Sequence, residues 1–154
     1  MYRRLAPAVL GYLRGQRVPD PEDLLGEVFL HVTRSLHHFS GDEDEDLRRW
    51  VFTIARHRVI DDVRRRARRP AILGEVPHDL PASPDGSGLD ADLLHALGRL
   101  NPEQREVVAL RFIADLPLSD VALITGRSVG AVKSMQLRAL AELARILRSA
   151  PGAG

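Results

Sequence analysis

The chain has 154 residues, of which 44% are hydrophobic and 28% are charged, a composition typical of a soluble globular protein with one or two small domains. Its apolar runs are far shorter than the roughly 20 residues of a membrane span, and the absence of cysteine excludes disulfides, thiol nucleophiles and thiolate metal sites. The N-terminus lacks the apolar core of a signal peptide, so we expect a cytoplasmic protein without membrane insertion. The net charge of +1, taken alone, argues against a nucleic-acid partner.

The distribution of charge along the chain changes that interpretation. Residues 1–74 carry 14 basic and 11 acidic side chains, residues 75–94 carry five acidic and no basic ones, and residues 95–154 carry eight basic and five acidic ones. The net charges of these segments are therefore +3, −5 and +3. All basic residues except Lys133 are arginines, whose planar guanidinium suits contacts with phosphates and base edges. The sequence thus predicts two basic units on either side of an acidic connector.

The connector is rich in proline and glycine between Pro70 and Gly88 and shows no apolar period, which predicts a flexible linker. We therefore expect a first domain over residues 1–72, a linker over residues 73–90 and a second domain over residues 91–150. These domains are called the first unit and the second unit below.

The first unit is predicted to contain three helices. One spans about residues 3–14. A second follows Asp20 and Pro21, which suit the N-cap and the first helical position, and ends before the acidic run 42–46. A third is expected over residues 47–69. The apolar stripes that should face the core are Leu24, Leu25, Val28, Phe29, Val32 and Leu36 on the second helix and Trp50, Val51, Ile54, Ala55, Ile60 and Val63 on the third.

The second unit is predicted to contain four helices. The first covers residues 93–100. The second begins at the cap pair Asn101-Pro102 and continues to Phe112. Pro117, at a first helical position, opens the third over residues 118–124. The fourth helix is expected over residues 129–148. Its inner face should consist of Val132, Met135, Leu140, Leu143 and Leu147. Because no segment alternates as a strand does, we predict an all-α fold with two small helical domains joined by a flexible linker.

The last two predicted helices form a helix-turn-helix. Thr125-Gly126 closes the first of them with a left-handed glycine, and Ser128 can cap the second, so the turn has the required length and residue types. The start of the second helix of such a motif enters the major groove of DNA. The residues expected there are Arg127, Ser128, Gly130, Ala131, Lys133, Ser134 and Arg138.

A second basic cluster lies on the third helix of the first unit. It is offset only by Asp61 and Asp62, and a run of like charges of this density matches a phosphate backbone better than a solvated face. The cluster consists of Arg56, Arg58, Arg64, Arg65, Arg66, Arg68 and Arg69.

These motifs carry a family resemblance. Three segments resemble region 2 of the sigma-70 family: residues 20–29 (DPEDLLGEVF), 39–41 (FSG) and 49–61 (RWVFTIARHRVID). Two segments resemble region 4: residues 101–112 (NPEQREVVALRF) and 128–134 (SVGAVKS). Both regions in this order, with only a linker between them, are similar to the extracytoplasmic-function (ECF) group of sigma factors.

The resemblance implies a role in transcription initiation, with core RNA polymerase and promoter DNA as partners and without a catalytic residue, metal or cofactor. The helix after Asp20 would bind the coiled coil of the largest polymerase subunit through Glu22, Asp23, Leu24, Glu27, Val28 and Phe29. The minus-ten element and the melted non-template strand would be bound by Ser40, Gly41, Arg48, Arg49, Thr53, Arg56, Arg58, Arg64, Arg65 and Arg66. The helix-turn-helix residues given above would bind the minus-thirty-five element as duplex DNA. The resemblance also implies an anti-sigma factor that holds the two domains closed.

Alternative interpretations remain open at this point. The chain could be a helix-turn-helix regulator that acts without polymerase, although its first 74 residues look like neither a dimerisation helix nor a ligand domain. It could also be a helical adaptor that does not bind DNA, which leaves the arginine cluster unexplained. Trp50 and Phe52 could stack on unpaired bases, although Trp50 lies in an apolar stripe typical of a core. The histidines His31, His37 and His38 lack the further ligands of a metal site.

Overall fold

The computed structural model describes residues 2–68 and 90–149. Within these ranges the chain is helical and contains no strand, which confirms the all-α prediction. The predicted linker over residues 73–90 lies, except for its last residue, outside the described ranges. The helices are α1 (Tyr2–Gly15), α2 (Pro21–Ser35), α3 (Asp44–Arg68), α4 (Ala91–Arg99), α5 (Pro102–Val108), α6 (Leu118–Thr125) and α7 (Val129–Ser149). A 3-10 turn (Leu36–His38) follows α2, and a π-helical turn (Ala109–Ile113) follows α5.

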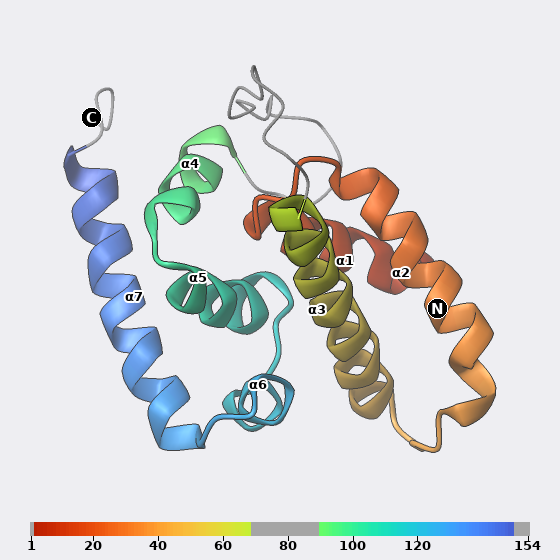
Figure 1. The fold of residues 1–154 in the computed structure, drawn as a ribbon. Coiled ribbons are helices and arrows are strands. Elements are labelled where there is room, and N and C mark those ends of the chain that lie inside the picture. Colours follow the sequence, from red (N-terminus) through yellow and green to blue (C-terminus); the bar gives the residue numbers. More distant parts are fainter. Residues whose placement is uncertain (1, 69–89, 150–154) are drawn as a thin grey trace.

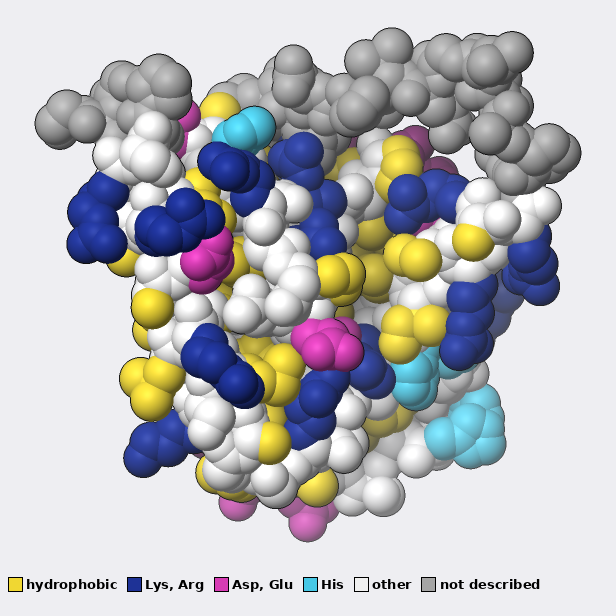
Figure 2. All heavy atoms as spheres, turned by 60° about the vertical axis from the view of Figure 1, so that its left-hand side comes forward, with side chains coloured by type: hydrophobic (Ala, Val, Ile, Leu, Met, Phe, Trp, Pro, Cys, Tyr) yellow, Lys and Arg dark blue, Asp and Glu magenta, His cyan; other side chains and the backbone are white. Residues whose placement is uncertain are grey.

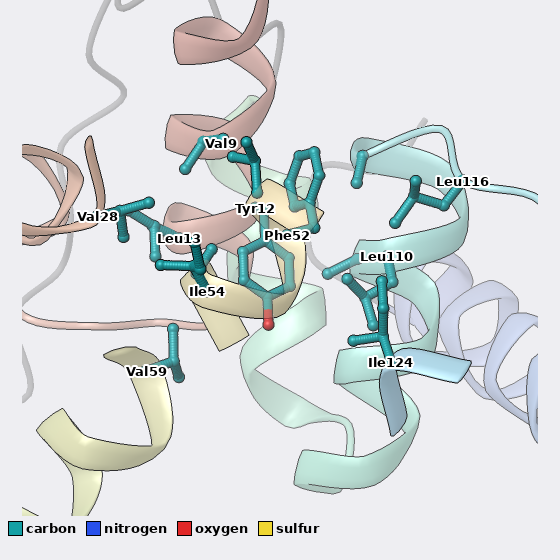
Figure 3. Close-up of a cluster of buried hydrophobic side chains, with 14 of the residues drawn as sticks. Val9, Tyr12, Leu13, Val28, Phe52, Ile54, Val59, Leu110, Leu116 and Ile124 are labelled. Atoms are coloured by element: carbon teal, nitrogen blue, oxygen red, sulfur yellow. The ribbon is translucent and has the colours of Figure 1, made fainter. Parts of the chain in front are cut away.

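The helices of the two units pack against one another. Figure 1 shows α2 and α3 on one side, α4, α5 and α7 on the other, and α1 behind α3. One large core cluster draws on both units, because α1 contacts the π-helical turn and α3 contacts α6. Figure 3 shows Tyr12 and Phe52 of the first unit close to Leu110, Leu116 and Ile124 of the second. A smaller apolar cluster joins α4, α5 and α7.

Local capping explains where the helices begin. The Asp20 carboxylate accepts a hydrogen bond from the Asp23 N–H at 3.2 Å ahead of α2. The Asn101 side chain accepts one from the Gln104 N–H at 2.8 Å ahead of α5. The Ser128 hydroxyl accepts one from the Ala131 N–H at 3.0 Å ahead of α7. Each bond satisfies a backbone donor that the first helical turn leaves free, so these three sequence-based caps are confirmed.

Helix α3 begins earlier than predicted. Its first residue is Asp44 rather than Leu47, so part of the acidic run is the first helical turn and not a loop. Carboxylates at a helix N-terminus interact favourably with the helix dipole, which explains the extension. The prediction that Val63 faces the core is wrong, since its side chain is 50% exposed. Val51, Ile54 and Ala55 are buried as predicted, and Phe52 and Val59 are buried in addition.

The second unit also differs in detail from the prediction. Pro117 occupies the N-cap of α6 and not the first helical position. The inner face of α7 is rotated: Leu140 is exposed and Leu147 half-buried, whereas the inner face consists of Val132, Met135, Ala139, Leu143 and Ile146. The small Ala139 has no exposed surface and lies in the cluster between α4, α5 and α7. Sequence periodicity favours the larger leucines, but packing at this contact selects the smaller residue.

The aromatic residues of α3 take different positions. Phe52 is completely buried, with its ring centroid 5.7 Å from that of Tyr12 in an edge-to-face arrangement. It is therefore a core residue and not a platform for unpaired bases. Trp50 is half-buried, and its ring centroid lies 5.2 Å from that of Phe39 in the segment before α3.

Candidate nucleic-acid interface

The helix-turn-helix consists of α6, a three-residue turn and α7. Gly126 adopts φ +70°, a left-handed conformation that costs a glycine little, and its N–H donates to the Ala122 carbonyl. This residue ends α6 and directs the chain into α7, where Ser128 caps the helix. The geometry required of the motif is thus formed by the residues that the sequence indicated.

The predicted DNA-reading residues lie on the exposed face at the start of α7. Ser128, Gly130, Ala131, Lys133, Ser134 and Arg138 are all exposed. A Cβ atom added at Gly130 would have no neighbour within 4 Å, so the backbone is open to close approach there. Arg127 differs, because it is half-buried and its guanidinium lies 3.7 Å from the Glu103 carboxylate. Figure 2, which brings the side of α7 forward, shows basic side chains interleaved with hydrophobic ones on this face.

Further along α7, a shallow groove separates the helix from α4 and the start of α5. Its lining includes Arg99, Arg138, Arg145 and Arg148, together with Glu142, which pairs with Arg145. The ion pair and hydrogen bond to Arg145 lower the pKa of the Glu142 carboxyl, so this carboxylate stays ionised among the arginines. The basic surface at the start of α7 therefore extends into this groove.

The arginines in the last part of α3 are mostly paired; Arg58 is half-buried, whereas Arg64, Arg65 and Arg66 are exposed. Arg58 lies 3.0 Å from Asp61, and Arg66 lies 2.9 Å from Asp62, at the i,i+3 and i,i+4 spacings of a helix. Arg65 lies 3.4 Å from Asp62 and 3.9 Å from Glu27 of α2. Exposed pairs of this kind are worth only about 0–1 kcal/mol, so phosphates can compete for these guanidinium groups. The cluster therefore remains available to an anionic ligand.

The arginines at the start and middle of α3 face the second unit instead. Arg48 donates from Nε and Nη2 to the Ala114 carbonyl at 2.8 and 2.6 Å. Arg49 lies 3.1 Å from Asp120 of α6. Arg56 lies 2.8 Å from Glu106 of α5 and donates to the Ile124 carbonyl at 3.3 Å. Three residues predicted to bind the minus-ten element thus hold the second unit in this structure.

A buried tyrosine lies beside one of these contacts. Tyr12 of α1 has no exposed surface, and burial together with the nearby Glu106 charge raises the pKa of its hydroxyl, which therefore stays neutral. The charges of Glu106 and Arg56 both act on this hydroxyl, so the ion pair lies against the apolar core. A charge pair beside such a core is screened less by solvent than a surface pair.

Comparisons with known proteins match both units. Residues 1–69 match the family model Sigma-70 region 2, and residues 90–143 match Sigma-70, region 4. The chain is 38% identical over 133 residues to the ECF RNA polymerase sigma factor BldN of Streptomyces coelicolor, covering 82% of this chain and 50% of BldN. It is 30% identical over 146 residues to the ECF sigma factor RpoE of Cereibacter sphaeroides, covering 87% of this chain and 77% of that protein. This chain belongs to the ECF sigma factors of the sigma-70 family.

The fold agrees with that family. The structure of CnrH in complex with the cytosolic domain of CnrY matches with a TM-score of 0.72 and 26% identity, covering 97% of this chain and 86% of CnrH. The first unit therefore contains sigma region 2 and the second contains region 4. The chain spans only half the length of BldN, although it spans most of CnrH and of the Cereibacter protein.

Region 2 places the residues predicted to bind core polymerase on two faces of α2. Leu24, Val28 and Phe29 are buried in the core. Glu22 and Asp23 are exposed, and Glu27 is half-buried. A partner that docks without disturbing the core would meet these three acids. The Glu22 carboxylate also forms an ion pair with the guanidinium of the buried Arg14 of α1, at a distance of 3.2 Å.

The remaining predicted minus-ten residues of region 2 lie before and on α3. Ser40 is exposed, and Gly41 is in a close turn in which an added Cβ would come within 2.6 Å of the Phe39 ring and of the Asp46 Cβ. The Thr53 hydroxyl donates to the Arg49 carbonyl at 2.8 Å within the helix. Nearby, a hydrogen bond with Glu43 and the surrounding acidic charges raise the pKa of Glu45. The acidic start of α3 thus lies beside the Ser40-Gly41 turn.

The oxygen atoms of region 4 that bind the arginines of region 2 were not predicted from the sequence. Glu106 and Asp120, with the Ala114 and Ile124 carbonyls, bind three arginines of region 2, and none of them was singled out as functional. The acids are single residues on short helices, and their partners are 50 and 71 positions away in the chain. No local pattern indicates a contact of that range.

Further observations concern a metal site and a membrane span. Within the described ranges, no three side chains of His, Asp or Glu lie close enough together to hold a metal ion. The rings of His37 and His38 lie 3.9 Å apart beyond the end of α2. Among the described residues, no helix is both long and apolar enough to cross a membrane.

Proposed function

We propose that this chain is a sigma subunit that binds core RNA polymerase, recognises the minus-ten and minus-thirty-five promoter elements and promotes DNA melting at the start of transcription. The observation that carries the proposal is the pairing of a complete helix-turn-helix in region 4 with the arginine-rich α3 of region 2 in one chain. A regulator that acts without polymerase accounts for the first of these elements and not for the second.

Under this proposal, each charged surface binds a different partner, which is assigned from the position of that surface. The start of α7 enters the major groove of the minus-thirty-five element, where Lys133, Ser134 and Arg138 reach base edges or phosphates. The exposed end of α3, with Arg64, Arg65 and Arg66, follows the phosphates of the minus-ten element. Glu22, Asp23 and Glu27 of α2 contact the largest polymerase subunit.

Melting under this proposal needs no bond to be made or broken. Unpairing costs about a few kcal/mol per base, which placement of a flipped base in a protein pocket and of the strand along a basic groove can offset. The chain would therefore act by binding alone, in the cytoplasm, and not as an enzyme. CnrH was solved with the cytosolic domain of CnrY, which supports a protein partner of anti-sigma type for the present chain as well.

Run-off transcription tests the proposal directly. The full chain is mixed with bacterial core polymerase, and promoters are selected from a randomised DNA library by their transcripts. We expect the chain to co-purify with core polymerase and to give promoter-specific transcripts that core polymerase alone does not give. Specific operator binding by the chain without polymerase association would instead identify a regulator of the other class.

The helix-turn-helix assignment predicts the effect of two substitutions on α7. Lys133→Ala or Arg138→Ala should weaken binding to the minus-thirty-five element by about 1–3 kcal/mol if the lost contact is to a base edge, and leave polymerase binding unchanged. Both side chains are exposed, so the fold should persist. Binding is measured by fluorescence anisotropy with holoenzyme and a duplex of the upstream element. Arg148→Ala, exposed near the end of the same helix, is the control and should have little effect. Equal losses of DNA and polymerase binding would point to misfolding and contradict the assignment.

A further inference from the structure

The groove between α7, the end of α4 and the start of α5 gathers positive charge that nearby acids offset only in part. Arg99 is the last residue of α4, whereas Arg138, Arg145 and Arg148 lie on α7. Among the described residues that line the groove, Glu142 is the only acid, so the lining has a net charge of +3. Arg99, Arg138 and Arg148 form no ion pair with another described residue. A concave surface lined by one sign of charge attracts an ion of the opposite sign.

Glu142 neutralises one arginine and still allows that arginine to bind a further acceptor. The Arg145 Nε lies 3.2 and 3.1 Å from the two carboxylate oxygens of Glu142, and the Arg145 Nη2 also donates to this carboxylate. A guanidinium has five N–H donors, so the Nη1 group of Arg145 keeps donors for a second acceptor. The hydrogen bond from Arg145 and the charges of Arg145 and Arg99 lower the pKa of the Glu142 carboxyl. The ionised Glu142 therefore orients the guanidinium of Arg145 without using all of its donors.

The arginines of α7 are spread along the groove. Arg138, Arg145 and Arg148 follow one another at spacings of seven and three residues, which correspond to about 10 and 5 Å along the helix axis. Ala141 lies between Arg138 and Arg145 in the lining, and its small side chain leaves space above the helix. Arg99 reaches the same space from α4. Positive groups distributed in this way fit an extended anion with several charges better than a single small ion.

The groove has the size of a small-ligand site. Its volume is about 620 Å³, and ligand pockets usually have volumes of about 300–1,000 Å³. Two amide side chains, those of Asn101 and Gln104, also line it. The Asn101 Oδ1 accepts the Gln104 N–H, so the Asn101 Nδ2 remains available as a donor. Guanidinium and amide N–H groups are donors that phosphate oxygens accept.

Duplex DNA fits this groove less well than a small ligand does. Under the proposed function the start of α7 enters the major groove, through residues such as Lys133 and Ser134. Arg145 and Arg148 follow Ser134 by 11 and 14 residues, which correspond to about 16 and 21 Å along the helix axis. The major groove of B-DNA is only about 8.5 Å deep. The second half of α7 and the groove beside it therefore lie outside the duplex.

We propose that this groove binds a polyphosphate group, either as free linear polyphosphate or as the triphosphate of a nucleotide. Arg99, Arg145 and Arg148 bind the non-bridging oxygens of the ligand, and Arg138 binds its end nearest the start of α7. The site itself does not depend on the proposed function, but its consequence does. Because Arg138 is also assigned to the minus-thirty-five element, a bound polyphosphate competes with DNA for this residue and weakens promoter binding by region 4.

Isothermal titration calorimetry of the full chain with sodium tripolyphosphate tests the site. The natural chain should bind one tripolyphosphate, with an affinity that falls as the salt concentration rises. Arg99→Ala combined with Arg148→Ala should lower this affinity roughly tenfold, because two partly screened charge contacts are lost. Both side chains are exposed and form no ion pair with a described residue, so circular dichroism should show an unchanged fold.

Glu142→Gln should have the opposite effect. The change keeps the shape of the side chain and removes the negative charge that faces the ligand together with the arginines. The affinity for tripolyphosphate should therefore rise about threefold. If Glu142 only supported the structure of the groove, its replacement would lower the affinity instead.

A matched control separates the site from a general charge effect. Arg3→Ala combined with Arg34→Ala removes the same charge at two exposed positions of the first unit and should leave the affinity for tripolyphosphate unchanged. Equal losses in this control and in the groove variant, or no loss in the groove variant, would overturn the proposal.

Titrations with ATP, GTP and a short polyglutamate peptide identify the class of ligand. Tighter binding of a nucleotide than of tripolyphosphate assigns the groove to the triphosphate of that nucleotide, and the reverse order assigns it to free polyphosphate. Tighter binding of the polyglutamate peptide than of any phosphate compound would contradict the proposal and point to an acidic protein partner.

Measurements with holoenzyme distinguish failure of the site from failure of the proposed function. Without tripolyphosphate, the Arg99→Ala/Arg148→Ala variant should bind the upstream duplex and support run-off transcription as the natural chain does. With tripolyphosphate in excess magnesium, duplex binding by the natural chain should weaken more than duplex binding by the variant. If the variant loses affinity for the duplex and keeps its affinity for tripolyphosphate, the groove belongs to the DNA interface and the proposal is wrong. If tripolyphosphate binds as expected but the natural chain gives no promoter-specific transcript, the site stands and the proposed function is wrong.

Discussion

Phe52→Ala is expected to lower the free energy of unfolding by about 3–5 kcal/mol, the usual cost of removing a buried phenylalanine. Phe52 has no exposed surface, packs edge-to-face on Tyr12 and lies 5.7 Å below the Arg48 guanidinium. The cavity would open in the core cluster that draws on both units, so both should lose stability together. A total stability of about 5–15 kcal/mol is usual for native proteins, and a loss of this size is a large part of it.

Thermal and urea unfolding followed by circular dichroism measure the effect. For a chain of this length, about 2–4 °C of melting temperature is lost per kcal/mol, so the expected fall is roughly 10 °C. Phe112→Ala is the control, because Phe112 is 46% exposed and its ring contacts the Arg111 guanidinium at the surface. It should cost less than about 1 kcal/mol. Similar losses in the two variants would mean that the ring of Phe52 does not contribute to a shared core.

Short-range sequence signals were sufficient for several local features of this chain. Helix starts at Asp20, Asn101 and Ser128 are confirmed because a cap depends on residues three positions apart, and such spacings can be read directly. The left-handed Gly126 is confirmed for the same reason. The helix-turn-helix, and with it the exposed face at the start of α7, follows from these signals together with the apolar period.

Choices between neighbouring apolar residues could not be predicted in the same way. Periodicity indicates a stripe, but the width of that stripe admits either Leu140 or Ala139 on α7, and either Val63 or Val59 on α3. The partner helix decides, since a close approach such as that of α7 to α4 and α5 accepts a small residue and excludes a large one. The inner faces of these two helices were therefore predicted only in part.

The binding partners of the arginines could not be predicted from local sequence patterns, for a different reason. A dense run such as residues 56–69 predicts an anionic ligand without indicating whether the anion belongs to DNA or to the same chain. In the structure the arginines of this run differ. Arg56 forms an ion pair with Glu106, whereas Arg64 has no ion pair among the described residues. Which arginine faces which acid depends on how two separately predicted units pack, and the sequence contains no periodic signal for that contact.

This division of α3 makes the exposed arginines the sharpest test of DNA contact. Arg64→Glu combined with Arg65→Glu should lower the affinity of the holoenzyme for promoter DNA about tenfold at low salt. It should also reduce the slope of log affinity against log salt by about 1.4, since each phosphate contact to a single strand releases about 0.7 counterions. Arg65 pairs with Asp62 and Glu27 at exposed positions, so the fold should lose no more than about 1 kcal/mol. Open-complex formation, followed by permanganate reactivity of unpaired thymines, should fall in parallel.

A charge-matched control decides whether the effect is local. Arg3→Glu combined with Arg148→Glu changes the net charge by the same amount at two exposed sites outside α3. If Arg64 and Arg65 lie on phosphates, this control should keep the salt slope of the natural chain, because a distant charge is screened beyond about 10 Å at moderate salt. An unchanged slope in the α3 variant, or the same reduction in the control, would mean that the end of α3 does not follow the phosphate backbone. Arg64 and Arg65 are informative here because neither is bound by region 4, so their loss leaves the contacts between the two units intact and reports on DNA alone.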